Sequence, residues 1–150
     1  MPSPKKAKNQ LYLVAFDGSP ESKKASDFAA ELGNKTGAEV RIVTVEDLAV
    51  LQREFGTTEQ TVRLQKKARQ GAESMVERER ARIHREGVAS SHAVITLGPP
   101  AEAIVKYAED AGADLIVMGS RGRTGIQRIL LGSVAARVVQ LAHCPVLVVR

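Results

Sequence analysis

Five short apolar segments alternate with stretches of helical spacing, and this alternation constrains the fold more than any other feature of the chain. The segments are residues 11–16, 40–45, 92–97, 114–119 and 145–149. Strands that alternate with helices form right-handed crossovers in a parallel sheet. Nearly continuous apolar runs such as 114–119 are typical of parallel strands that are covered on both faces. We therefore predict a three-layer α/β fold, with a five-stranded parallel sheet between two layers of helices.

The first two connections carry clear helix signals. Ser19 can cap a helix that has Pro20 at its first position, and Gly37 follows its end. Its apolar face would hold Ala25, Phe28, Ala29 and Leu32. A long, charged second helix is expected over about 59–86, with a core-facing stripe made of Leu64, Ala68, Ala72, Met75, Val76 and Ile83.

The remaining connections are shorter. A third helix should begin at Pro99 or Pro100 and stop at Gly112, and a fourth should carry the apolar residues between 134 and 142. Residues 46–58 show no clear period, so we expect a loop or an irregular segment there. The sequence contains no internal repeat and no sign of a second domain.

Length and charge indicate one domain with a basic extension. A chain of 150 residues is most simply one folded unit, which we place at residues 11–150. Lys5, Lys6 and Lys8 lie in the first ten residues, and we expect residues 1–10 to be a flexible tail. Without these three of the 22 basic residues, 19 remain against 17 acidic ones, a net charge of +2. That balance is too small for a nucleic-acid footprint, so nucleic-acid binding is not expected.

The composition also bears on location and on metals. No apolar run approaches the roughly 20 residues of a membrane-spanning helix, and the short apolar segment 11–16 behind the basic start does not make a secretory signal. The expectation is a cytoplasmic protein without membrane association. Cys144 is the only cysteine, and it is expected to be a buried structural thiol rather than a metal ligand, because no Cys/His cluster surrounds it.

A glycine-rich stretch directly after the fourth apolar segment points to a ligand site. It reads GSRGRTGIQRILLGS over residues 119–133. In open α/β sheets, ligands bind at the carboxyl ends of strands, near the point where the strand order reverses. In a sheet of order 3-2-1-4-5, this stretch and the segment AFDGSPES after the first strand would face one crevice.

The chemistry of that stretch favours an anion. Gly119 and Gly122 allow a tight turn and a close approach of a ligand to the backbone. Gly132 and Ser133 stand at the start of the last helix, where free amides and the helix dipole favour phosphate. The simpler alternatives stay open: turn glycines, an N-capping Ser133, and an Asp17 that only caps its turn. The dinucleotide fingerprint, the P-loop and the nucleophile elbow are absent from the sequence.

The spacing Gly119-x2-Gly122-x9-Gly132-Ser133 resembles the nucleotide-binding motif of the universal stress protein family, in its ATP-binding branch. The resemblance extends over roughly residues 11–149. It implies a Rossmann-like nucleotide-binding fold, with ATP as ligand and any Mg²⁺ held through the nucleotide and Asp17. It also implies contact of the adenine with the backbone at Val45. Phe16 is larger than the residue usual in the family. The nucleotide-binding residues implied are Ala15, Phe16, Asp17, Val45, Met118, Gly119, Arg121, Gly122, Gly132, Ser133 and Val134.

The residues favour a binding module over an enzyme. Asp17 is the only obvious acidic group at the predicted site, and the sequence supplies no second group as a general base. We expect a nucleotide-dependent regulatory switch in the stress response that acts on an unknown protein partner. The alternative is a slow ATPase or a phosphoryl or nucleotidyl transferase. The segment 145–149 is apolar and would lie at a sheet edge, so a homodimer through that strand is predicted, as the resemblance also implies.

Overall fold

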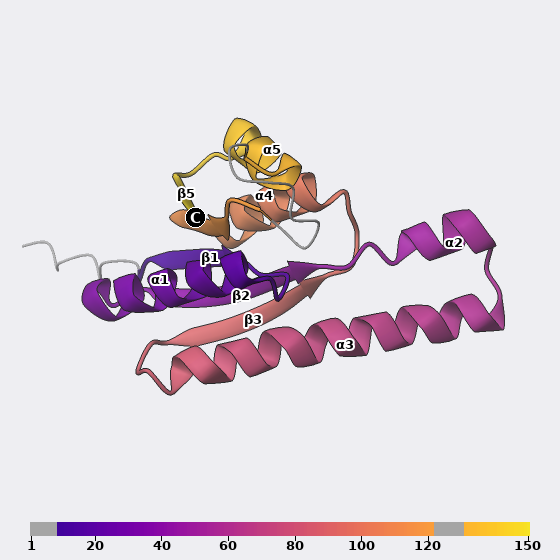
Figure 1. Ribbon diagram of the computed structural model, residues 1–150, viewed down its shortest axis with the longest axis horizontal. Helices are drawn as coiled ribbons and strands as arrows, with labels where there is room; N and C mark the ends of the chain where they lie inside the picture. The colour runs from indigo at the N-terminus through magenta and orange to yellow at the C-terminus, as the bar shows by residue number, and fades with distance from the viewer. Residues whose placement is uncertain (1–8, 122–130) are drawn as a thin grey trace, which may run out of the picture.

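The computed structural model describes residues 9–121 and 131–150, and its centre is a five-stranded parallel sheet (Figure 1). The strand order is β3-β2-β1-β4-β5, which confirms the predicted topology. Ala15 at the end of β1 pairs with Val43 on one side and with Met118 on the other. The strands are β1 (Leu11–Ala15), β2 (Glu39–Val45), β3 (Ser90–Ile95), β4 (Leu115–Gly119) and β5 (Val146–Val149).

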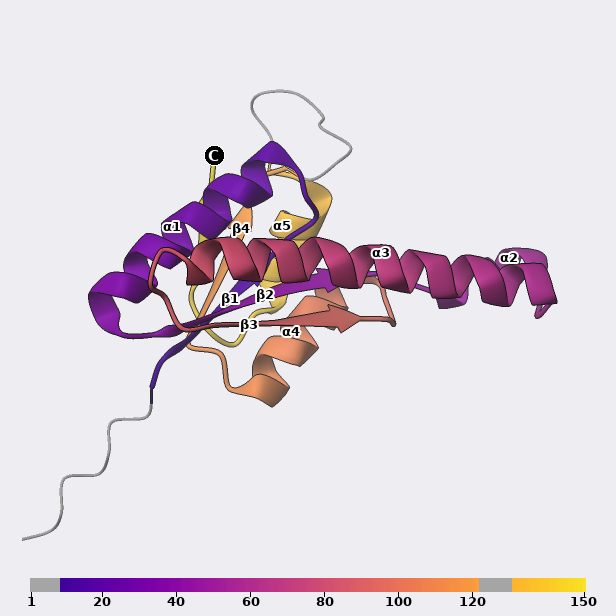
Figure 2. The same cartoon turned by 90° about the horizontal axis from the view of Figure 1, so that it is seen from below.

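Helices cover both faces of the sheet, as predicted. One face is covered by α1 (Pro20–Thr36) and α3 (Glu59–His84), and the other by α4 (Pro100–Ala111) and α5 (Ser133–Leu141) (Figures 1 and 2). Alternate residues of β1 enter the two cores. Val14 packs with the side chains of α1 and α3, whereas Leu13 packs with those of α4 and α5, and both are completely buried. Full burial of such a side chain stabilises the fold by about 1.5–3 kcal/mol.

The first helix follows its sequence signals closely. Ser19 is the N-cap, and its hydroxyl oxygen accepts a hydrogen bond from the Ser22 amide at 3.2 Å. Gly37 ends the helix in the left-handed conformation, with φ of 75°. The third and fourth helices predicted from the sequence correspond to α4 and α5, and both begin and end within a residue or two of the predicted positions.

Three expectations about secondary structure and burial were wrong. Residues 46–58 contain a short helix, α2 (Ala49–Phe55), which has no buried residue and therefore left no clear apolar period. The third strand begins two residues earlier than predicted, because the polar Ser90 and Ser91 pair with β2. Phe28 and Leu64 were expected to face the core, but they are largely exposed.

Among the described residues, no helix is both long enough and apolar enough to span a membrane. The predicted tail lies almost entirely in residues 1–8, which are outside the described residues.

Candidate functional site

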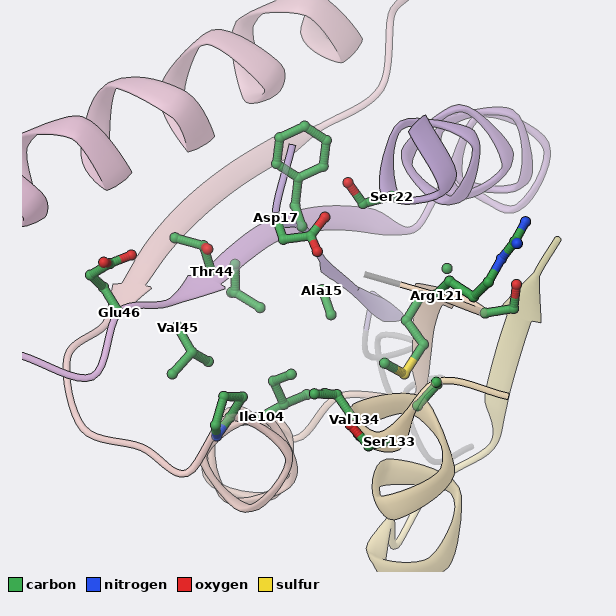
Figure 3. Close-up of a pocket in the computed structure, with 18 residues that line it drawn as sticks. Ala15, Asp17, Ser22, Thr44, Val45, Glu46, Ile104, Arg121, Ser133 and Val134 are labelled. Carbon is green, nitrogen blue, oxygen red and sulfur yellow. The ribbon is translucent and has the colours of Figure 1, made fainter. Parts of the chain in front are cut away.

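A pocket of about 280 Å³ opens at the carboxyl ends of β1, β2 and β4, where the strand order reverses (Figure 3). This is the position at which doubly wound sheets bind their ligands. The volume is near the lower end of the ~300–1,000 Å³ range of small-molecule sites. The start of α4 and the start of α5 close its other side.

Ten of the eleven predicted site residues line this one pocket: Ala15, Phe16, Asp17, Val45, Met118, Gly119, Arg121, Gly132, Ser133 and Val134. Gly122, the eleventh, lies outside the described residues. The sequence reasoning did not name the other lining residues, which are Ser22, Val43, Thr44, Glu46, Pro100, Ile104, Ser120 and Ala135. Half of these come from β2 and α4. Their residue types are common ones, so only their position beside the strand ends could have indicated them.

Asp17 follows β1 and takes part in a tight turn. Its carboxylate oxygen Oδ1 accepts a hydrogen bond from the Ser19 amide at 2.9 Å. The next residue, Gly18, has φ of 81°, and a Cβ there would lie 3.1 Å from the sulfur of Met75. The turn-capping alternative for Asp17 is therefore observed, and the same side chain also lines the pocket.

The backbone of Val45 extends beyond the last residue of β1. The Val43 carbonyl faces β1 and accepts the Phe16 amide at 2.8 Å, whereas the Glu46 amide faces β3 and donates to Ile95 at 2.7 Å. Successive residues of a strand turn their amides and carbonyls to opposite sides, so Val45 faces the same side as Val43. Pairing of β2 with β1 ends at Val43. The amide and carbonyl of Val45 are thus directed toward the pocket end of β1.

The start of α5 presents backbone amides to the pocket. Gly132 is the N-cap, and among the described residues no side chain caps this helix. The Gly132 amide donates to the Ser120 carbonyl at 2.7 Å, so this amide is already used, contrary to our expectation that both Gly132 and Ser133 would offer theirs. The amides of Ser133 and Val134, in the first turn, have no intrahelical acceptor. A Cβ on Gly132 would lie 3.0 Å from the Ser120 carbonyl oxygen. A residue with a side chain would therefore be crowded at this position, which explains why it is a glycine.

Two residues at the end of β4, Arg121 and Gly119, lie against Glu21 of α1. The Arg121 Nη2 atom lies 3.3 Å from Oε1 of Glu21, in the first turn of α1. A Cβ on Gly119 would lie 2.7 Å from the Glu21 Cβ. The glycine is therefore required here for close packing of α1 on the strand end.

The two ends of the pocket differ in chemistry (Figure 3). Arg121 and Ser133 lie at one end, and Val45 lies toward the other, with Ile104 and Val134 on the wall formed by α4 and α5. An apolar surface beside Val45 suits a flat ring, and the amides of α5 suit an anion. The described lining contains two carboxylates, Asp17 and Glu46, and no histidine.

Phe16 lines the pocket and also belongs to the core, whereas Cys144 lies outside the pocket lining. Phe16 is buried in the core under α1 and α3, beside Val14. Cys144 is half-buried beside a second cavity, of about 180 Å³, and burial raises the pKa of its thiol. A raised pKa disfavours the reactive thiolate. Within residues 9–121 and 131–150, no group of three or more His, Cys, Asp or Glu side chains is placed to hold a metal ion.

The fold and the pocket define a doubly wound α/β domain with a pocket at its switch point, where such domains bind their ligands. The chain belongs to the universal stress protein family, whose model matches residues 10–150. It is 40% identical to universal stress protein MJ0531 of Methanocaldococcus jannaschii, over 92% of this chain and 80% of that protein. It is 35% identical to universal stress protein YxiE of Bacillus subtilis, over 92% of this chain and 97% of that protein.

Solved structures share the fold. The structure of protein MJ0577 of M. jannaschii superposes with a TM-score of 0.81 at 31% identity, covering 93% of this chain and 94% of that one. A universal stress protein in complex with cAMP superposes with a TM-score of 0.61 at 26% identity, covering 96% and 98% of the two chains. The universal stress protein of Archaeoglobus fulgidus in complex with dAMP, at 21% identity and a TM-score of 0.68 over 95% and 98%, shows the common fold alone.

Proposed function

We propose that this protein binds an adenine nucleotide, ATP carrying Mg²⁺, and that occupancy of the pocket regulates its contact with a protein partner in a stress response. The observation that carries the proposal is the arrangement of the pocket, with the first-turn amides of α5 and an arginine at one end and an apolar wall beside the strand-end backbone of Val45 at the other. A family member that holds cAMP supports an adenine ring as the ligand.

Each part of the nucleotide has a matching surface in this proposal. The adenine would lie against Val45 and Ile104 and use the Val45 backbone. The ribose would lie near Asp17, which would also meet Mg²⁺ bound to the nucleotide. The phosphates would accept hydrogen bonds from the amides of Ser133 and Val134, since a helix N-terminus favours anions. Ala15, Phe16, Met118 and Gly119 would form the floor, and Gly122 would complete the loop.

Isothermal titration calorimetry with Mg²⁺·ATP, ADP and AMP tests this proposal. Ala15 lines the pocket, so Ala15→Leu should fill it and lower the affinity for ATP at least tenfold, which corresponds to about 1.4 kcal/mol. Ala103→Leu is the matched control, because Ala103 is also half-buried but lies outside the lining. The absence of binding heat for all three nucleotides would contradict the proposal.

We infer binding rather than turnover from the pocket carboxylates. Asp17 already accepts the Ser19 amide, and Glu46 lies at the opposite end from Arg121 (Figure 3). Neither is placed as a general base beside the phosphate end. Release of phosphate over many turnovers, abolished by Asp17→Ala, would instead establish the slow ATPase or transferase.

We also propose that the protein is a homodimer through β5 and acts in the cytoplasm, where adenine nucleotides are abundant. β5 forms one edge of the sheet, and its four residues are all apolar. A two-fold axis could pair two such edges in one self-complementary contact. Light scattering should show that Val148→Lys is a monomer, while Val94→Lys on the opposite edge remains a dimer.

A further inference from the structure

Arg121 is held by an acidic residue outside the pocket lining. Its Nη2 atom lies 3.3 Å from Oε1 of Glu21, and the two side chains are 33% and 20% exposed. Figure 3 shows the guanidinium directed away from the centre of the pocket. The one cation of the described lining is thus engaged by a carboxylate of this chain.

Glu21 occupies a fixed position, whereas Arg121 can adjust. Ser19 caps the helix that carries Glu21, and the backbone of Glu21 packs on Gly119 so closely that a Cβ there would lie 2.9 Å from the Glu21 carbonyl carbon. Arg121 has a long side chain at the end of β4. Its guanidinium can reorient without any movement of the Glu21 backbone.

We propose that Glu21 regulates nucleotide affinity by competing with the phosphates for Arg121. This inference rests on the proposed nucleotide-binding function and deepens it. A guanidinium forms comparable charge-assisted hydrogen bonds with carboxylate and with phosphate. Bound phosphates must draw Arg121 from Glu21, and the Glu21 charge repels them at the same time.

The competition affects nucleotides differently according to the charge of their phosphates. A triphosphate attracts Arg121 more strongly than a monophosphate does, and it is also repelled more strongly by Glu21. Removing the Glu21 charge therefore relieves a larger penalty for ATP than for AMP. Glu21 is a positioning residue in this scheme, because it acts on the ligand through Arg121.

The test is a double-mutant cycle with Glu21→Gln and Arg121→Gln, followed by calorimetry with ATP and with AMP. Glu21→Gln should tighten ATP binding about two- to fivefold, the range expected for a partly exposed ion pair. The gain should be smaller for AMP, and in the Arg121→Gln background it should shrink for both nucleotides. Glu21→Ser should behave like Glu21→Gln, which guards against a folding defect in one variant.

Glu102→Gln is the matched control. Glu102 also lies in the first turn of a helix and pairs with an arginine, Arg137, at 3.0 Å, but it does not line the pocket. ATP affinity should not change in this variant. An equal gain there, or unchanged or weaker ATP binding in Glu21→Gln, would overturn the competition. Absence of nucleotide binding in every protein, wild type included, would overturn the proposed function first and this inference with it.

Discussion

The two halves of α3 have similar helical sequence patterns but very different surroundings. In residues 72–84, Ala72, Val76 and Ile83 are buried against the sheet. In residues 59–71, only Thr61 is buried, and Val62 and Leu64 are 51% and 45% exposed. Figures 1 and 2 show this first half extending past the sheet together with α2.

The difference follows from the lengths of the elements. A helix of 26 residues is about 39 Å long, at 1.5 Å per residue. The neighbouring strand β3 has 6 residues, which span about 20 Å. The sheet can therefore cover only about half of the helix. An apolar stripe in a sequence shows that a helix can bury one face, but the length of the partner decides how much of it is buried.

The largest effect on stability is expected for Ile83→Ala, in residues 72–84 of α3, the half that the sheet covers. Ile83 is completely buried with Val76 in the core between α3 and the sheet. Removing a buried isoleucine side chain leaves a cavity and should lower the free energy of unfolding by about 2–5 kcal/mol. Urea denaturation measures this change. A loss below about 1 kcal/mol would show that the covered half of α3 contributes little to stability.

The second-largest effect on stability is expected for a substitution of Glu79, because its charged side chain is buried in the same half of α3. Its carboxylate accepts hydrogen bonds from Nε and Nη2 of Arg82, at 3.1 and 2.6 Å. Glu79→Gln should cost about 1–3 kcal/mol, because it weakens a charge-assisted pair at a buried site. Glu31→Gln, at an exposed pair on α1, is the control and should cost far less.

The same carboxylate predicts a pH dependence. Burial alone would raise the pKa of Glu79, but the hydrogen bonds and charge of Arg82, together with contributions from Ser26 and Lys23, outweigh it and hold the pKa below the ordinary 4.5. The unfolded state therefore binds the proton first as the pH falls. This contribution to stability is complete above about pH 4.5 and is lost as the pH falls through the lowered folded pKa. Unfolding curves at several pH values should show a weaker acid dependence for Glu79→Gln than for the wild type.

The fold was largely predictable from the sequence, and the site only in part. The α/β architecture could be predicted because apolar strands and helix caps alternate along the chain, and the strand order was predicted from the fold type that this pattern and the family resemblance imply. The pocket residues near Gly119 and Gly132 were predicted from the glycine spacing and the family resemblance that it carries, whereas the close packing of both glycines was seen only in the structure. Glu21 could not be identified from its type or spacing, because its contact with Arg121 joins residues 100 positions apart. The exposure of Leu64 depends on the length of β3, which no local pattern encodes.

Substitution of His92 should lower the free energy of unfolding less than substitution of Glu79, because the partners of His92 lie on the surface. Its Nε2 atom is 2.6 Å from Glu73 and its Nδ1 atom 2.9 Å from Glu77, so it connects the edge strand β3 to the covered half of α3. We expect His92→Gln to cost about 0.5–1 kcal/mol, the range of a typical side-chain hydrogen bond. A double-mutant cycle with Glu73→Gln measures the coupling, and fully additive losses would show that the two side chains act independently.

Leu64→Ala should have the smallest effect, although Leu64 belongs to the same predicted stripe as Ile83. Its side chain is 45% exposed, so truncation removes little buried apolar area and leaves no closed cavity. Alanine also favours the helix slightly more than leucine does. The free energy of unfolding should therefore change by less than about 0.5 kcal/mol, as for ordinary surface substitutions. Urea denaturation beside Ile83→Ala gives a direct comparison of the two halves. A loss for Leu64→Ala as large as that for Ile83→Ala would mean that the projecting half is covered in solution, for example by a second copy of the chain.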